Sequence, residues 1–185
     1  MLEDLCLGSY YFEVANVLRA SLLLSSLLSN SESWYNLSPK DISKLEAVDE
    51  SLLRKIFSAH SKTAKGLLYL ESGNIPVRYI LIARRSNFLW YILNESEDSL
   101  LRKFFNAQCD NPVKGDWIKT VLNDLKHLDL HYSLPEIQNL SKNEFKNIVK
   151  NSVRQKTLKY LNEFFIMVKK ITSLVERNFK NVCGK

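Results

Sequence analysis

The sequence has few of the residues that make tight turns: five glycines and four prolines in 185 residues. A sandwich or barrel of many short strands needs turn residues at each reversal of the chain, so this scarcity argues against both. No stretch alternates apolar and polar residues in the way that predicts a strand, and no repeat of solenoid length occurs. The remaining fold class is all-α, and the helix signals predict a single bundle of about six to seven helices.

Cysteine is scarce as well, and recognised catalytic motifs are missing. The three cysteines, Cys6, Cys109 and Cys183, are odd in number and far apart, which is typical of a reducing compartment rather than a disulfide framework. No P-loop, dinucleotide-binding glycine motif or zinc knuckle occurs, and His127 and His131 lack the further ligands of a zinc site. The Asp-Asp pair with which a polymerase palm holds two metal ions is also missing. We therefore expect no catalytic residue, metal or cofactor in this chain.

The sequence also lacks a basic N-terminal segment of the kind that begins a signal peptide, since its first leucine-rich stretch, residues 22–28, follows three acidic residues. The most apolar stretch, residues 75–93 (IPVRYILIARRSNFLWYIL), has apolar side chains on every side of a helix, as a membrane span or a central core helix does. A span would place Arg84 and Arg85 in lipid at about 2.5–3.5 kcal/mol each. We therefore expect a core helix, no membrane partner, and an intracellular protein, cytoplasmic or nuclear.

The arginines of this stretch need partners. On a helix, Arg78 and Arg85 are seven residues apart and share one face, while Arg84 points elsewhere. One interpretation pairs them with acidic residues of the preceding helix, such as Glu46, Asp49 or Glu50. The other pairs at least one of them with a phosphate, because a planar guanidinium binds an oxyanion through two hydrogen bonds. In both interpretations each buried arginine has an anionic partner, because a buried charge without one is strongly destabilising.

Positive charge gathers in the C-terminal part of a chain whose net charge is +6. Residues 1–60 hold five basic and eight acidic side chains, a net charge of −3, whereas residues 111–185 hold fourteen and seven, a net charge of +7. Such asymmetry indicates a polyanionic partner, nucleic acid before membrane, although solubility alone would also explain it.

A capping box at Ser141 and Glu144 predicts that residues 141–185 form one long helix, packed on or projecting from a bundle of residues 1–140. Along its first half every fourth residue is basic, and the neighbouring arc is apolar and would dock the helix. We call the basic residues the basic strip: Lys142, Lys146, Lys150 and Arg154. Such a strip suits a helix lying along a phosphate backbone, but an ordinary solvated helix face has the same pattern.

Two further features have both a structural and a binding interpretation. Apolar residues spaced three and four apart within residues 161–175 form a seam that would pack on the bundle or mediate oligomerisation with a second chain: Leu161, Phe164, Val168, Ile171 and Val175. Trp34 and Tyr35 follow a helix break, where they would belong to the core or stack on bases.

Several phrases of the sequence together resemble a known family. They are GSYYFEVANVLRASLLLSSLLSNSESWYNLS (8–38), LLRKIFSAHSKTAKGLLYLESGNIPVRYILIARRSNFLWYIL (52–93), FFNAQCDNPVKGDW (104–117) and SKNEFKNIVK (141–150). They resemble the region that follows the reverse-transcriptase palm in polyproteins of animal non-LTR (LINE-like) retrotransposons, over roughly residues 8–160. The resemblance implies a helical thumb or post-palm region that grips template–primer duplex, with an upstream polymerase palm as its partner. The polymerase and endonuclease motifs of that family have no counterpart here.

Two functional hypotheses follow. The first is a non-catalytic helical region of a retrotransposon RNA-directed DNA polymerase, which binds RNA or RNA–DNA hybrid through the phosphate backbone. Its candidate nucleic-acid-binding residues are the three arginines and the basic strip: Arg78, Arg84, Arg85, Lys142, Lys146, Lys150 and Arg154. The alternative is a stand-alone intracellular protein-interaction domain that uses the apolar seam, with the basic strip facing an acidic partner.

Overall fold

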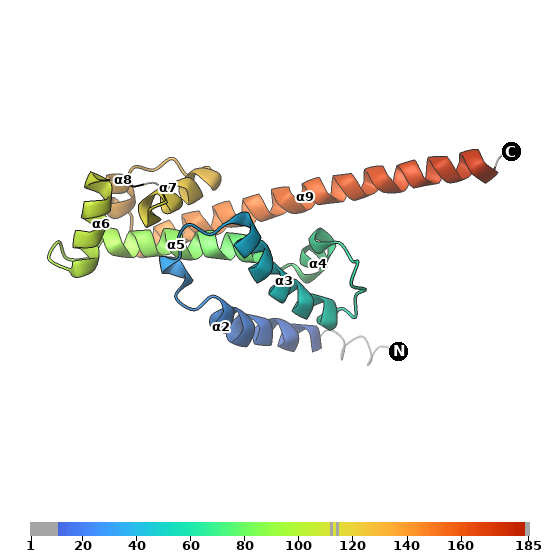
Figure 1. Cartoon of the computed structure of the whole chain (residues 1–185), viewed down its shortest axis with the longest axis horizontal. Coiled ribbons are helices and arrows are strands. Elements are labelled where there is room, and N and C mark those ends of the chain that lie inside the picture. The colour runs from blue at the N-terminus through green and yellow to red at the C-terminus, as the bar shows by residue number, and fades with distance from the viewer. Residues whose placement is uncertain (1–10, 112, 114, 184–185) are drawn as a thin grey trace.

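The computed structural model describes residues 11–111, 113 and 115–183, with the side chains of the last helix described up to Met167 and at Lys169. Every regular element in this part of the chain is helical, which confirms the all-α prediction. Figure 1 shows their arrangement. In chain order they are the π-helix η1 (Arg19–Leu24), α2 (Ser25–Leu27), the 3-10 helix η2 (Ser31–Ser33), α3 (Pro39–Ile56), α4 (Lys65–Ser72), α5 (Val77–Leu93), α6 (Leu100–Asp110), α7 (Trp117–His127), α8 (Leu134–Asn139) and α9 (Lys142–Cys183).

Helix α5 is the hub of the bundle, as its all-round apolar character predicts. It contacts η2, α3, α6, α7, α8 and the first half of α9 (Figure 1). The largest core cluster forms where α5 meets the helices that follow it, and it includes Leu89, Val121 and Phe145. Each of these side chains is almost completely buried, which contributes about 1.5–3 kcal/mol per large apolar residue relative to exposure.

The N-terminal half has smaller apolar clusters and more buried charge. Leu24 and Leu28 of the first helical segment meet Val77 and Leu81 of α5. Ser38 followed by Pro39 predicts the start of a helix, and α3 begins there. Ser38 and Asp41 also form a capping box. Its buried face carries three carboxylates rather than a row of leucines: Glu46, Asp49 and Glu50.

Two helix boundaries differ from those that the sequence predicts. A proline in the segment SLP (133–135) predicts a break between helices. The segment instead begins α8, because Pro135 lies in the first turn and Ser133 forms a capping box with Glu136. The helical spacing of Tyr11, Val14 and Leu18 predicts a first helix over residues 8–30. Its described part, from residue 11, is helical up to Leu27 and contains the six-residue π segment η1, while Asn30 has a left-handed φ of 54°.

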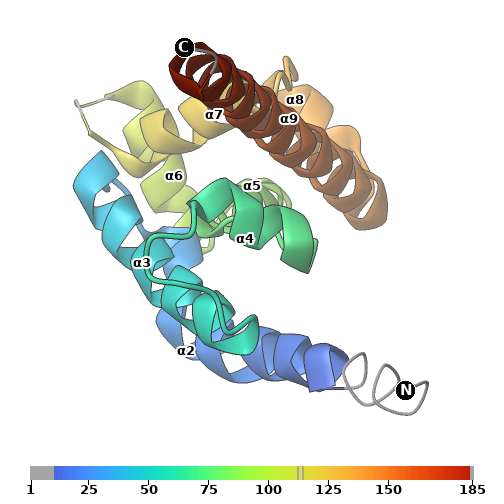
Figure 2. The same cartoon turned by 90° about the vertical axis from the view of Figure 1, so that its right-hand side faces the viewer.

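Helix α9 begins with the predicted capping box of Ser141 and Glu144. Its first half packs on α5 and α4, and its second half extends beyond the other helices (Figures 1 and 2). The first seam residue, Leu161, is buried against Leu68 and Tyr69 of α4, and the ring of Phe164 lies against Gly66. The side chains of Val168, Ile171 and Val175 lie outside the described part. None of the described helices combines the length and apolar character needed to cross a bilayer.

Candidate nucleic-acid interface

Two of the three α5 arginines form ion pairs with carboxylates of neighbouring helices. Arg78 donates from Nε and Nη2 to the two carboxylate oxygens of Glu46 on α3, both at 2.6 Å. This bond raises the pKa of Arg78. Arg85 donates from Nε to Oδ2 of Asp124 on α7, also at 2.6 Å, and both side chains are largely buried. Arg78 thus has a partner that the sequence suggested, whereas Asp124 was not among the predicted partners of Arg85.

The Asp124 carboxyl illustrates the cost of this burial. Desolvation raises its pKa, while the hydrogen bond and charge of Arg85 act in the opposite direction. A buried carboxylate without a cation would be strongly destabilising, so the role that the geometry gives to Arg85 is to hold α5 and α7 together. The Arg85 side chain, which is 6% exposed, has little surface left for a phosphate.

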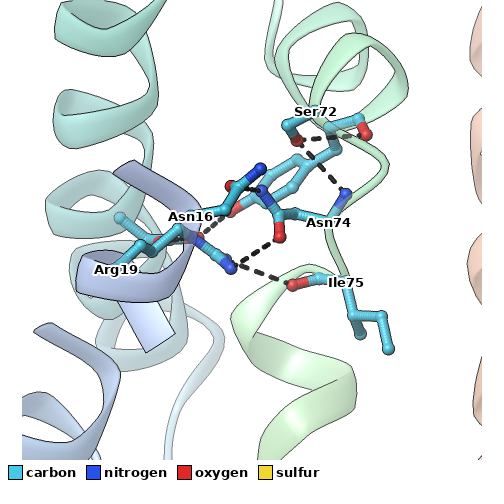
Figure 3. Close-up of polar contacts among 7 residues, drawn as sticks. Asn16, Arg19, Ser72, Asn74 and Ile75 are labelled. Carbon is cyan, nitrogen blue, oxygen red and sulfur yellow. Dashed lines mark hydrogen bonds and ion pairs between the residues drawn. The ribbon is translucent and has the colours of Figure 1, made fainter. Parts of the chain in front are cut away.

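The other two acids on α3 take cations from elsewhere in the chain. Asp49 accepts two hydrogen bonds of 2.6 Å from Arg19 and one of 3.0 Å from the Tyr69 hydroxyl. Arg19 also donates to Asn74 and to the Ile75 carbonyl, as Figure 3 shows. Glu50 pairs with Lys65 of α4 at 3.0 Å and with Arg54 at 3.6 Å. Neither acid therefore neutralises an arginine of α5.

Arg84 differs from its two neighbours. It donates to the Leu28 carbonyl and, at 3.3 Å, to the Ser31 hydroxyl, and no described carboxylate forms an ion pair with it. These neutral acceptors hold the side chain in place but leave its charge uncompensated. Of the α5 arginines, Arg84 is therefore the one whose positive charge remains available to an anion.

Arg84 lines a cleft of about 430 Å³ where η2, the second half of α5 and the start of α9 meet. The cleft brings Arg84 together with the first two residues of the basic strip, Lys142 and Lys146, although they lie far apart in the sequence. The complete lining is Glu32, Arg84, Asn87, Phe88, Trp90, Tyr91, Lys142, Phe145 and Lys146. Three cations thus face one carboxylate around a largely aromatic wall.

Local contacts explain why α9 begins at this point. The indole Nε1 of Trp90 donates to the Leu140 carbonyl at 2.8 Å and thereby fastens the α8–α9 connection to α5. The capping box then starts α9, and Phe145 is buried one turn later. Because Phe145 faces the core, Lys142 and Lys146 are left at the edge of the cleft.

The aromatic wall is itself ordered by stacking. Phe88 lies between two rings: it is nearly parallel to Tyr91, at a centroid distance of 6.1 Å, and edge-on to Trp117, at 5.7 Å. Tyr91 is the most accessible of the aromatic residues in the lining, with 48% of its surface exposed. The cleft therefore offers one accessible ring, Tyr91, next to a nearly parallel and more buried one, Phe88.

The basic strip continues from the cleft along α9. All four of its residues are exposed, and none forms an ion pair with a carboxylate in the part of the chain that the structure describes. Lys156, by contrast, is bound to Asp129 at 2.7 Å. At 1.5 Å per residue the strip covers about 18 Å of helix. The cleft and the strip together form one positive surface that includes five of the seven predicted residues.

Of the cleft residues on α5, only Arg84 was predicted to bind nucleic acid. The spacing of the others in the sequence could have identified them. Arg84, Asn87, Phe88 and Tyr91 are spaced i, i+3, i+4 and i+7, which places them on one helix face. The two aromatic residues that follow the first helix break lie elsewhere: Trp34 is partly buried against a small apolar cluster, and Tyr35 is exposed.

The described residues contain no group of three or more histidine, cysteine, aspartate or glutamate side chains that could hold a metal ion. His127 instead stacks on Tyr79 at a centroid distance of 6.1 Å. In comparisons with known proteins, no family model, no curated protein and no solved structure matches this chain.

Proposed function

We propose that this chain is a non-catalytic helical region that binds nucleic acid, either RNA or RNA–DNA hybrid, through the phosphate backbone. The observation that carries the proposal is the convergence of Arg84, Lys142 and Lys146 on one cleft, from which Lys150 and Arg154 continue along α9. None of these five charges is neutralised by a described carboxylate. A continuous row of uncompensated cations is the arrangement that attracts a polyphosphate.

The ion pairs of the bundle separate the arginines that stabilise the fold from the residues that bind nucleic acid in this proposal. Arg78 and Arg85 are held by Glu46 and Asp124, so we assign them to the stability of the bundle. The basic strip lies beside an arc of α9 that is buried against α5, which fixes the helix so that its lysines present one side. Contacts of this kind position a protein on nucleic acid without reading its sequence.

The resemblance of residues 8–160 to the region behind a retrotransposon reverse-transcriptase palm supports a more specific form of the proposal. In that form the chain acts as a thumb-like region and grips template–primer duplex beside an upstream palm domain. The phosphate-contacting surface is the same in both forms, so an experiment on binding tests it directly.

The test is a titration of an RNA–DNA hybrid duplex at several salt concentrations. On duplex DNA each phosphate that the protein neutralises contributes about 0.9 to the slope of log K against log salt. We expect the triple variant Lys146→Ala/Lys150→Ala/Arg154→Ala to bind more weakly and to have a slope smaller by about 2–3. The matched control removes three exposed lysines elsewhere, Lys40, Lys55 and Lys62, and should keep the slope. Absence of binding at low salt, or an unchanged slope in the triple variant, would reject the proposal.

A second candidate function is protein interaction through the extended half of α9. Phe165, Ile166 and Met167 are consecutive on this helix and 44–54% exposed, and a cluster of exposed apolar side chains is a common mark of an interface. Sedimentation equilibrium tests whether the chain self-associates through these residues. It compares the wild type with a variant that has serine at the three positions. A mass that rises with concentration only in the wild type supports this function, and a concentration-independent monomer argues against a second copy as the partner.

A further inference from the structure

The cleft contains more than a cationic surface needs. A phosphate backbone requires only the lysines and arginines, yet the cleft also has an accessible ring, Tyr91, and the polar side chains of Asn87 and Glu32. Its volume of about 430 Å³ lies within the range of about 300–1,000 Å³ that is usual for small-molecule sites. Such a cavity can therefore accommodate a compact part of a larger ligand.

The charges in the cleft favour an anionic ligand. Arg84, Lys142 and Lys146 contribute three positive charges against the single carboxylate of Glu32. Arg84 is bound only to neutral acceptors among the described residues, and the two lysines have no ion pair there. One phosphate group placed among them would be held by charge-assisted hydrogen bonds.

The aromatic residues favour a planar ring. Tyr91 is half exposed and lies nearly parallel to Phe88, with an angle of 10° between the ring planes. The ring of Tyr91 is a neutral phenol at pH 7, because the ordinary pKa of tyrosine is about 10 and a hydrogen bond with Glu95 raises the pKa of Tyr91 above that value. Nucleic-acid bases stack on such rings whatever their sequence, because every base has a π-face. The Asn87 amide and the Glu32 carboxylate supply donors and acceptors for a base edge.

We propose that this cleft holds one unpaired nucleotide of the bound nucleic acid, with its base against Tyr91 and its phosphate between Arg84 and Lys142. The inference rests on the proposed function and specifies the ligand of the same surface. The nucleotide must be unpaired, because the face of a base inside a duplex is covered by its neighbours and cannot reach a pocket. The ligand is therefore a duplex with a single-stranded end: the basic strip holds the duplex and the cleft holds the first free base.

The experiment compares two RNA–DNA hybrids by fluorescence anisotropy, one blunt and one carrying a three-nucleotide single-stranded overhang. The full chain should bind the overhang hybrid more tightly. Tyr91→Ala should weaken binding of that hybrid at least about fivefold, since stacking contributes on this scale or more, and should leave the blunt hybrid unaffected. Tyr91→Phe keeps the ring and should retain the preference. Tyr132→Ala removes an exposed tyrosine outside the cleft and is the matched control.

The outcomes separate the inference from the proposed function. Equal binding of the blunt and overhang hybrids by the wild type, or an unchanged preference in Tyr91→Ala, would overturn the inference and leave backbone binding in place. Absence of binding to either hybrid at low salt would overturn both. A second measurement places 5-bromouridine at the first overhang position. Photocrosslinking to the α5 peptide that contains Phe88 and Tyr91 supports the inference, and crosslinking confined to other peptides contradicts it.

Discussion

The guanidinium of Arg19 and the carboxylate of Asp49 face each other through two hydrogen bonds of 2.6 Å, and their side chains are 4% and 0% exposed. The Tyr69 hydroxyl donates to the same carboxylate, and Asn74 accepts a further bond from Arg19 (Figure 3). This one network joins the first helical segment, α3, α4 and the approach to α5. Arg19 itself lies in a π-helical segment, a form that is rare in proteins and is frequently found at functional positions.

The first prediction concerns this pair. Asp49→Asn should lower the free energy of unfolding by about 3–5 kcal/mol, because it leaves the Arg19 charge buried without a counterion. Replacing both partners, as in Arg19→Met/Asp49→Leu, should cost less than the single substitution, since no uncompensated charge remains. Urea unfolding followed by circular dichroism measures each value.

The surface pair of Asp41 and Lys44 is the control for this prediction. Its atoms are 3.9 Å apart, and the lysine is 71% exposed. Lys44→Ala should change the free energy of unfolding by less than about 1 kcal/mol. If Asp49→Asn were no more destabilising than Lys44→Ala, the buried network would not hold the N-terminal half together.

The second prediction concerns stability at alkaline pH. Burial, together with the Asp49 carboxylate, raises the pKa of Tyr69 far above its ordinary value of 10.0. In the unfolded chain the phenol ionises near pH 10, whereas in the folded protein it keeps its proton. Its contribution to stability is therefore fully present below pH 10 and is lost as the pH rises above 10, at up to about 1.4 kcal/mol per pH unit.

Tyr69→Phe tests this sign. The variant should be less stable at pH 7 by about 1 kcal/mol, because a buried hydrogen bond is removed, but its stability should fall less steeply above pH 10. Some slope will remain, since burial also raises the pKa of Tyr79. Unfolding curves between pH 8 and pH 11 give both slopes, and equal slopes would contradict the prediction. Tyr132→Phe, at an exposed tyrosine, is the control.

The third prediction concerns Gly66 in α4. A Cβ at this position would overlap with the ring of Phe164 on α9, closer than any van der Waals contact. Alanine normally stabilises a helix interior by about 1 kcal/mol relative to glycine. Here we expect Gly66→Ala to destabilise the protein by about 1–3 kcal/mol, because the ring has to move. Recovery of stability in Gly66→Ala/Phe164→Leu would identify the ring as the cause, and a thermal melt measures both variants.

The fourth prediction separates structural from binding arginines and lysines. Arg85→Met should lower the free energy of unfolding by about 3–5 kcal/mol, since Asp124 stays buried without its cation. Measured on the folded fraction, its salt slope for RNA–DNA hybrid should equal that of the wild type. Lys150→Ala should do the opposite: stability within about 0.5 kcal/mol of the wild type and a slope smaller by about 0.9. A reduced salt slope in Arg85→Met would indicate that Arg85 contacts a phosphate and would contradict the prediction.

Local patterns in the sequence predicted the local features of the fold. Ser38 followed by proline predicts the start of α3, the capping box of Ser141 and Glu144 predicts the start of α9, and the all-round apolar stretch predicts a core helix at α5. Each signal depends on residues within a few turns of one another, and all three predictions were confirmed. Pro135 led to a wrong prediction of a helix break, because proline is common both just after the end of a helix and in the first turn of the next. The distinction depends on the side chains that follow, here Glu136.

Glu46 was among the partners that the sequence suggested for Arg78, but the partners of Arg85 and Arg19 could not be predicted in the same way. Arg85 and Asp124 are 39 residues apart, and Arg19 and Asp49 are 30 apart. Several acids were available to each arginine, and only the packing of the helices selects among them. The residues on the α5 side of the cleft could be predicted from their helical spacing. The presence of Lys142 and Lys146 on its other side could not, because it depends on where α9 crosses α5.

The acidic face of α3 determines how the N-terminal half comes together. Glu46, Asp49 and Glu50 each meet a cation from a different element: Arg78 of α5, Arg19 of η1 and Lys65 of α4. If α3 were rotated or shifted by one residue, all three carboxylates would lose their counterions at once, and each would carry a desolvation penalty. Leucines tolerate a neighbour that slides past them, but these acids do not. The three ion pairs of α3 therefore fix its rotation and its register relative to η1, α4 and α5, and only one alignment of these helices satisfies all three.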